Sequence, residues 1–146
     1  EKRNLSILKV GKLMHLIIKA FNKRSEEKTH KEIKISTEQF GLLYAISKIE
    51  EEVIQKDMAE MMGKDKSAIL RLIDSLEEKD LVRRVVDQKD RRKNCLMVTK
   101  LGYRVIDEYL SIINELMLEI QEGLNQEEID TFHKVVMHII TKAENL

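Results

Sequence analysis

The sequence predicts a mainly α-helical protein that carries one small β-hairpin. The 146 residues include no proline, and residues that favour helices, such as Lys, Glu, Leu and Ile, are abundant. Apolar residues recur at helical spacing over most of the chain, but two short β-branched segments interrupt this pattern between residues 81 and 98. The length suits a single folded chain, residues 1–146, with a core of its own.

A long amphipathic helix is expected first, because apolar residues from Leu5 to Phe21 recur at steps of three, four and five. Residues 25–34 are largely polar and charged, which predicts a loop or a frayed helix end. Ser36, followed three residues later by Gln39, predicts the capped start of a second helix.

A helix-turn-helix is expected next, after an acidic connector at residues 50–52. Its first helix covers about residues 55–62 and ends at Gly63, which suits a left-handed helix end. Asp65 is placed to cap the second helix, which runs to about Lys79.

A β-hairpin with a long charged tip follows this motif. Residues 81–86 and 95–98 are short and β-branched, and residues 87–94 between them are entirely polar. Because neighbouring residues of a strand point to opposite faces, Arg83 and Arg84 diverge. One of them can then reach a phosphate while the other pairs with an acidic neighbour.

Two further helices are expected after the hairpin. Thr99 is placed to cap a long helix that ends at Gly123, and Asn125 with Glu128 predicts a second capping box. A helix-turn-helix followed at once by a basic hairpin is a winged helix-turn-helix, here flanked by long N- and C-terminal helices.

The charge is neutral in total but unevenly distributed. The chain has 26 basic and 26 acidic residues. Residues 83–104 hold eight basic and two acidic side chains, a net charge of +6, whereas residues 105–146 hold two basic and nine acidic ones, a net charge of −7. A local basic cluster on a neutral protein predicts an anionic partner, and this cluster coincides with the hairpin.

Several classes of protein are disfavoured. No nucleophile–base pair, glycine-rich phosphate loop or carboxylate pair stands out, so we expect neither an enzyme nor a cofactor. The single Cys excludes an intramolecular disulfide, and the histidines lack the spacing of metal ligands (His15, His30, His133 and His138). No apolar run approaches the ~18 residues of a membrane span and no leader is evident, so no membrane association and a cytoplasmic setting are expected.

Three segments resemble the MarR family of bacterial transcriptional regulators. Residues 66–84 look like its recognition helix running into the first strand of the wing, residues 87–94 like the wing tip, and residues 99–102 like the threonine-to-glycine run that opens its long fifth helix. The flanking helices match in order and length, so the resemblance covers nearly the whole chain. Asp80 stands where the family often has Gly, and Gln88 lies near a common Pro, which predicts a more flexible wing.

The resemblance implies a sequence-specific, DNA-binding transcription regulator, with repression released by a small-molecule effector as the expected mode. It implies a homodimer joined by helical dimerisation regions at residues 1–35 and 101–146. The winged helix-turn-helix, residues 36–100, would then bind a near-palindromic operator in double-stranded DNA.

The residues expected at the DNA come from the helix-turn-helix and the hairpin tip. Arg71 is placed to read a guanine and Ser67 to bond a phosphate. Arg92 matches the wing arginine that enters the minor groove, and Asp90 matches the acidic residue that orients it. The full set is Gln55, Lys56, Lys64, Lys66, Ser67, Ala68, Arg71, Lys89, Asp90, Arg91, Arg92 and Lys93.

Other interpretations stay open for several residues. The hairpin cations are also compatible with a solvated loop, and Arg71 with a surface ion pair to Asp74. Another class of function is a helical protein-interaction or dimerisation module whose wing binds an acidic protein surface. Cys95 suits packing or a redox-sensing regulator, and His15 suits a helix-face or dimer contact or an effector contact.

Overall fold

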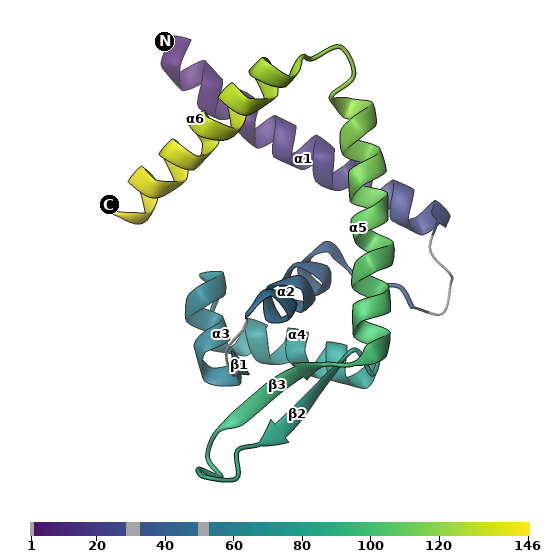
Figure 1. The fold of residues 1–146 in the computed structure, drawn as a ribbon. Coiled ribbons are helices and arrows are strands. Elements are labelled where there is room, and N and C mark those ends of the chain that lie inside the picture. The colour runs from purple at the N-terminus through teal and green to yellow at the C-terminus, as the bar shows by residue number, and fades with distance from the viewer. Residues whose placement is uncertain (1, 29–32, 50–52) are drawn as a thin grey trace. The chain divides into compact units, whose positions relative to one another are not determined.

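The structure, a computed structural model, describes residues 2–28, 33–49 and 53–146, with side chains from residue 8 onward. Its elements are α1 (Lys2–Lys28), α2 (Thr37–Lys48), β1 (Val53–Ile54), α3 (Gln55–Met62), α4 (Lys66–Glu78), β2 (Val82–Val86), β3 (Asn94–Val98), α5 (Lys100–Ile120) and α6 (Gln126–Glu144) (Figure 1). The predicted class, mainly helical with a small sheet, is confirmed. The chain divides into two compact units, Glu1–Asn114 and Glu115–Leu146.

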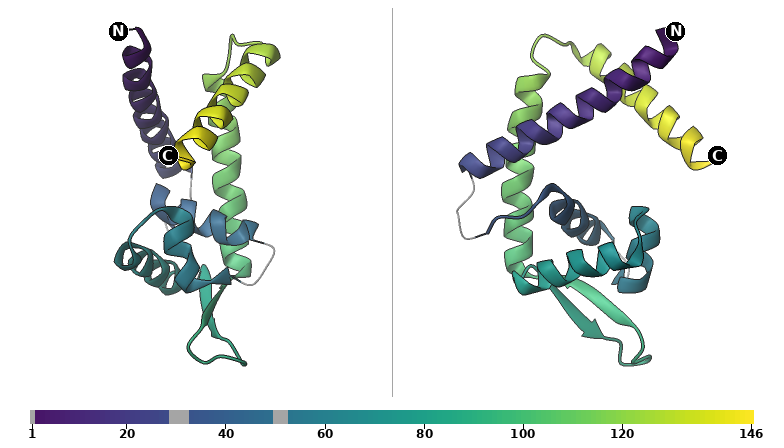
Figure 2. Two further views of the ribbon diagram at one scale, coloured as in Figure 1. Left: turned by 90° about the vertical axis from the view of Figure 1, so that its left-hand side faces the viewer. Right: turned by 180° about the vertical axis from the view of Figure 1, so that it is seen from behind.

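The core of the first unit is built from apolar side chains of its helices and strands. Figures 1 and 2 show α2, α3 and α4 gathered at the start of α5, with the β2–β3 hairpin projecting beyond them. The largest fully buried side chains are Leu42, Leu43, Met58, Ile69, Ile73, Leu76, Leu81, Val82, Val105 and Tyr109. These residues lie at the positions that face inward from each element, so burial of apolar area holds the unit together.

Three aromatic rings join α1, α2 and α5 within this unit. The ring centroids of Phe21 and Phe40 lie 5.8 Å and 5.5 Å from that of Tyr109. The Tyr109 hydroxyl also accepts the backbone N–H of Ile35 at 3.1 Å. Because a buried N–H without a partner is costly, this bond fixes the segment before α2 against α5.

The helix ends predicted from local capping signals are confirmed. Ser36 Oγ accepts the backbone N–H of Gln39 at 3.1 Å, and Gln39 Oε1 accepts that of Ser36 at 2.7 Å. Asp65 Oδ1 accepts the backbone N–H of Ala68 at 2.8 Å at the start of α4. Gly63 ends α3 in the left-handed conformation, with a φ of 62°.

In the second unit, α6 also begins with the predicted capping box. Asn125 Oδ1 accepts the backbone N–H of Glu128 at 2.9 Å, and Glu128 Oε2 accepts that of Asn125 at 3.0 Å. No residue of α6 is buried, and Phe132 and Ile139 are each 58% exposed. The apolar stripe predicted for this helix is therefore open to solvent in a single chain.

Two features differ from the expectation. α1 reaches Lys28, so the first part of the segment predicted as a loop or frayed end is helical; residues 29–32 and the acidic connector at 50–52 lie outside the described residues. β1 adds a third strand, antiparallel to β3, which gives the strand order β1-β3-β2. A two-residue strand carries no alternating pattern, so the sequence did not reveal it.

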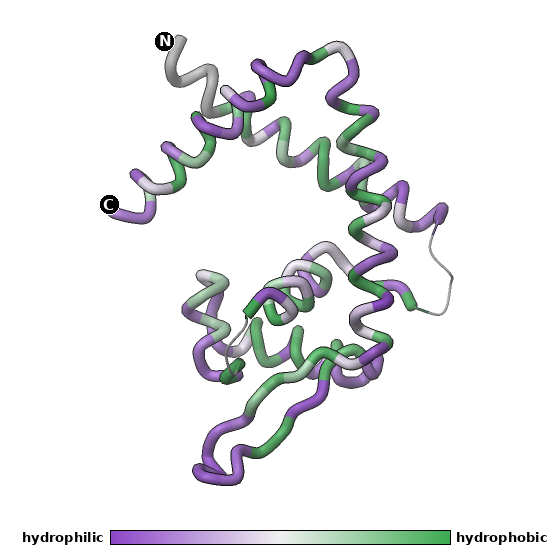
Figure 3. Tube along the Cα trace, in the orientation of Figure 1, coloured by the Kyte–Doolittle hydropathy of each residue, from purple (hydrophilic) through white to green (hydrophobic). Residues whose placement is uncertain are grey.

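The hairpin combines apolar strands with a hydrophilic tip. Figure 3 shows green segments along β2 and β3 and a purple turn between them. β2 and β3 pair antiparallel from Val82 opposite Val98 to Val86 opposite Asn94. None of the described helices is long and apolar enough to cross a membrane.

The start of α5 packs against the turn that leads into the hairpin. Thr99 Oγ1 accepts the backbone N–H of Gly102 at 2.9 Å, which confirms the predicted cap, and donates to the carbonyl of Asp80 at 2.7 Å. The Thr99 N–H donates to the Leu81 carbonyl at 3.1 Å. A Cβ on Gly102 would overlap with that carbonyl oxygen. The threonine-to-glycine run therefore sets where the hairpin begins relative to α5.

Replacement of Gly102 by Ala is expected to lower the free energy of unfolding by about 1–3 kcal/mol, because the added methyl group overlaps backbone. Gly41→Ala is the matched control. Gly41 lies inside α2 with no atom within 4 Å of the added Cβ, so this change should stabilise by up to about 1 kcal/mol. Urea unfolding at one protein concentration measures both. Equal effects at the two positions would contradict the close packing at Gly102.

Candidate nucleic-acid interface

The first turn of α4 presents polar side chains to solvent. Asp65 caps the helix, and Lys66, Ser67 and Arg71 are exposed, while Ala68 is half-buried. Ser67 and Arg71 are four residues apart and so share one face of the helix. The opposite, apolar face is buried in the core. An exposed polar face on a helix anchored in this way is what reading a DNA groove requires.

Arg71 does not form the surface ion pair with Asp74 that was one interpretation of its position. Asp74 Oδ1 instead lies 2.5 Å from Nη2 of Arg84. Within the part of the chain that the structure describes, Arg71 takes part in no ion pair. Its guanidinium is therefore available to a partner outside the chain.

The hairpin tip is ordered by two aspartates. Asp87 accepts the backbone N–H of Lys89 at 2.9 Å, and Asp90 accepts that of Arg92 at 3.0 Å. Such bonds, two residues along the chain, stabilise tight turns. Asp90 also lies 3.4 Å from Nε of Arg92, the pairing that the resemblance implied. The Arg92 side chain is nonetheless 93% exposed, so the tip presents a partly oriented cation to solvent.

A groove of about 670 Å³ lies between α3, α4 and the hairpin tip. Its lining includes six predicted DNA contacts, Gln55, Lys56, Lys66, Asp90, Arg92 and Lys93, together with Asp57 and Asn94. Four of these are cations and two are carboxylates. A concave surface with an excess of positive charge attracts anions more strongly than a flat one.

Other predicted contacts lie outside this groove. Lys64 points to α2, where its Nζ lies 3.6 Å from Oε2 of Glu38. Lys89 lines a different pocket, formed with α2 and the sheet. Arg91 is exposed at the tip. Their contact with DNA stays a prediction.

Arg84 joins the hairpin to both helices of the helix-turn-helix. On α4 its guanidinium bonds Asp74 Oδ1 at 2.5 Å and Glu77 Oε1 at 2.9 Å. Its Nε donates to Gln55 Oε1 at 2.7 Å at the start of α3. Desolvation by burial lowers the pKa of Arg84, but the hydrogen bonds and charges of Asp74 and Glu77 outweigh it, so the pKa is raised above its ordinary value.

The predicted divergence of the two strand arginines is confirmed. The Arg84 side chain is 22% exposed and turned to α4, whereas that of Arg83 is 72% exposed and lies 3.8 Å from Asp80. Gln55, expected only as a DNA contact, also anchors Arg84. That role was missed because its partner is 29 residues away in the chain.

Neither His15 nor Cys95 lies where its functional interpretation would favour. His15 is exposed on α1 and is not among the residues that line the pocket between α1, α2 and α5, which has a volume of about 720 Å³. Cys95 is 7% exposed, and burial disfavours the accessible thiolate that a redox sensor needs. Among the described residues no group of three or more His, Cys, Asp or Glu is arranged to hold a metal ion.

Comparison with known proteins identifies the relatives of this arrangement. A model of the MarR family matches residues 33–93, which include the helix-turn-helix and most of the hairpin. The transcriptional regulator BldR from Sulfolobus solfataricus is 27% identical and has the same fold, with a TM-score of 0.72 over 94% of this chain and 96% of that one. Residues 33–93 thus match the MarR family, and the chain shares the fold of these regulators.

Two further structures share the fold at lower identity. S. aureus MepR, solved as a complex with DNA, is 22% identical with a TM-score of 0.77, and the match covers 94% of this chain and 96% of MepR. CouR from Rhodococcus jostii RHA1, bound to p-coumaroyl-CoA, is 22% identical with a TM-score of 0.71, and the match covers 89% of this chain and 87% of CouR.

The structure accommodates the two departures from the common MarR pattern. Asp80 has a φ of 59°, the left-handed conformation that favours glycine and that Asp tolerates better than most residues. At the tip, the bonds made by Asp87 and Asp90 supply local order in a loop that lacks the Pro common near Gln88.

Arg84→Ala is expected to lower the free energy of unfolding by about 1–3 kcal/mol, because it removes the hydrogen bonds of a mostly covered guanidinium to Asp74, Glu77 and Gln55. Arg83→Ala removes the same charge from the next residue but is expected to cost at most about 0.5 kcal/mol, since that side chain is exposed. Urea unfolding and hydrogen exchange of the hairpin amides measure both effects. Equal destabilisation by the two changes would exclude a stabilising role for the bonds of Arg84 to α3 and α4.

Proposed function

We propose that this chain is a sequence-specific DNA-binding transcriptional regulator that acts as a homodimer. The observation that carries the proposal is the exposed face of α4, with Ser67 and Arg71, beside the groove to which the hairpin contributes Arg92. α4 can then enter a major groove of DNA while the hairpin tip reaches the minor groove beside it. The proposal gives the chain no enzymatic role, and as a regulator it would act in the cytoplasm with the chromosome.

The roles of the side chains follow from their geometry. Arg71 has a planar fork of donors that fits the O6 and N7 acceptors of guanine. Lys66 and Ser67 stand at the N-terminus of α4, where the partial positive charge of the helix favours a phosphate. Arg92, steadied by Asp90, is suited to the negative potential of a narrow minor groove. The DNA complex of MepR, which shares the fold, supports this assignment.

A homodimer is supported by apolar residues that a single chain leaves exposed. On α1 they include Leu8, Val10, Met14 and Leu16, and on α6 Phe132, Val135, Met137, Ile139 and Ile140. Apolar faces on two helices are typical of surfaces that are buried on association. Two copies would place their recognition helices at half-sites about 34–36 Å apart on a near-palindromic operator.

An effector is proposed to act through the pocket between α1, α2 and α5, and the expected mode is relief of repression. Gln39 lines this pocket, and its Nε2 donates to Ser75 Oγ of α4 at 2.8 Å. A ligand that moves α2 would therefore also move the recognition helix. Preference of the ligand for a dimer with misplaced helices would weaken DNA binding by population shift. The bound ligand of CouR, a protein of the same fold, supports a ligand-responsive chain.

Arg71→Ala and Arg92→Ala are each expected to weaken binding to a selected operator by about 1–3 kcal/mol, roughly fivefold to 150-fold. Lys66→Ala is expected to lower the slope of log K against log salt by about one, as loss of one phosphate contact does. Selection from a random duplex pool supplies the operator, and titration at several salt concentrations gives both quantities.

Lys48→Ala is the matched control for these changes. Lys48 is an exposed cation at the end of α2, 5.3 Å from the ring centroid of Tyr44, and it is outside the predicted contact set. Unchanged affinity in the Arg71→Ala/Arg92→Ala double variant would exclude the proposal. It would favour the alternative, a helical module whose wing binds an acidic protein surface.

Phe132→Glu is expected to weaken self-association by at least about 2 kcal/mol, roughly thirtyfold, because it places a charge on the apolar stripe of α6. Gln126→Glu adds the same charge to an exposed polar position at the start of that helix and should leave the dimer intact. Sedimentation equilibrium measures both. A monomer in the unmodified protein, or equal effects of the two variants, would contradict the α6 interface.

A further inference from the structure

The groove between α3, α4 and the hairpin tip holds an apolar side chain that is open to solvent. Among the described residues that line it, Ala59 and Ile69 are buried and Ile54 is half-buried, whereas Leu70 of α4 is 39% exposed. The other lining residues are charged or carry an amide. A single exposed leucine is ordinary on a protein surface. Its place among the cations of the proposed DNA interface is what gives Leu70 a possible role there.

Leu70 lies on the side of α4 that faces the hairpin. It is one turn after Lys66, which also lines the groove, and one turn before Asp74, which bonds Arg84 of β2. It is also three residues after Ser67, on the face of α4 proposed to enter the major groove. Leu70 therefore lies at the edge of that face, next to the side on which the groove continues to the hairpin tip.

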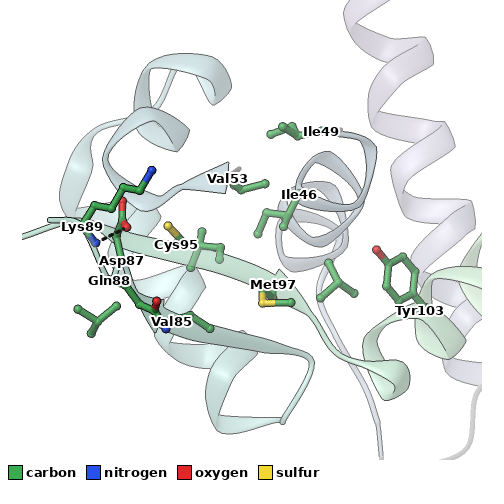
Figure 4. A pocket seen from close by; sticks show the side chains of 13 residues that line it. Ile46, Ile49, Val53, Val85, Asp87, Gln88, Lys89, Cys95, Met97 and Tyr103 are labelled. Atoms are coloured by element: carbon green, nitrogen blue, oxygen red, sulfur yellow. Dashed lines mark hydrogen bonds between the residues drawn. The ribbon is translucent and has the colours of Figure 1, made fainter. Parts of the chain in front are cut away.

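Other apolar side chains of the DNA-binding region do not share this position. Val85 and Met97 line the pocket between α2 and the sheet (Figure 4). Met61 is 61% exposed near the end of α3 and is not among the residues that line the groove. Ala68, the apolar residue of α4 in the predicted contact set, is half-buried and does not line the groove either.

The major groove of DNA offers an apolar side chain one specific partner. Thymine presents its C5-methyl group there, and apolar side chains read this group by contact. The major-groove edges of the other three bases present donors and acceptors without a methyl group. A leucine that covers those edges removes them from water and gives no hydrogen bond in return. An exposed leucine on a recognition helix therefore favours thymine at the base that it covers.

We propose that Leu70 is a specificity-determining residue that contacts the C5-methyl group of one thymine in each half-site of the operator. This thymine would lie at the edge of the major groove nearest to the hairpin, in the same half-site as the guanine proposed for Arg71. The inference rests on the proposed function and adds an apolar contact to its polar ones. It requires that the operator lose affinity when this methyl group alone is removed.

Replacement of single thymines in the selected operator by deoxyuridine removes the methyl group and keeps the base pair. In one half-site, uracil at the position covered by Leu70 is expected to weaken binding about fourfold, as loss of one methyl group from an apolar contact does. The Leu70→Ala variant is expected to bind the thymine and uracil duplexes equally at this position. Titration of each duplex at one salt concentration measures these ratios.

Met61→Ala is the matched control, because it shortens an exposed apolar side chain that does not line the groove. This variant should retain the full preference for thymine. Leu70→Ala is expected to leave the slope of log K against log salt unchanged, because it removes no phosphate contact. An unchanged slope also shows that the variant is folded and still docks on the DNA.

A methyl effect of equal size in the Leu70→Ala variant and the unmodified protein would assign the thymine to another side chain and overturn the proposal. The absence of any thymine whose methyl group affects binding would overturn it as well, and so would a salt slope that changes in Leu70→Ala. These results all presuppose a selected operator. A random pool that yields no preferred sequence would instead exclude the proposed function itself, and this inference with it.

Discussion

The wing can act together with the recognition helix only if the two keep a fixed relation, and the hydrogen bonds and ion pairs of the partly buried Arg84 impose it. Burial alone would disfavour this guanidinium, but two carboxylates on α4 and an amide on α3 satisfy three of its nitrogens. Asp74 and Glu77 are three residues apart, so both lie on the face of α4 that meets β2. A rotation of the hairpin would break these bonds together and leave the guanidinium of Arg84, which is 22% exposed, without its partners.

The same arrangement explains how a chain of zero net charge can present a basic surface. Several acidic residues of the DNA-binding region make interactions within the described part of the chain. Asp65 caps α4, Asp74 and Glu77 hold Arg84, and Asp90 holds the tip and Arg92. The cations that remain, on α4 and along the groove, face solvent. Local potential, rather than the sum of charges, governs which partner approaches this surface.

The parts of the structure that the sequence predicted are those encoded locally. A helix cap such as that of Ser36 and Gln39 depends only on residues within one helical turn. The opposite directions of Arg83 and Arg84 follow from the geometry of a strand. The strand β1 was not predictable in this way, because two residues become a strand only by pairing with β3. The partners of Arg84 and the pockets were equally out of reach, since they arise where segments distant in sequence meet. The predicted DNA contacts lie together only in part, because Lys64 and Lys89 turn to other surfaces.

The two faces of the small sheet are held in different ways. A hairpin is only marginally stable by itself, so its position depends on what covers its faces. At its base the Leu81 carbonyl is held by Thr99, and on the α4 side Arg84 is held by charged partners. On the other side Val85 and Met97 remain partly in water, and no comparable charged interaction fixes them among the described residues. The position of the hairpin relative to α4 is therefore set mainly from the Arg84 side of the sheet.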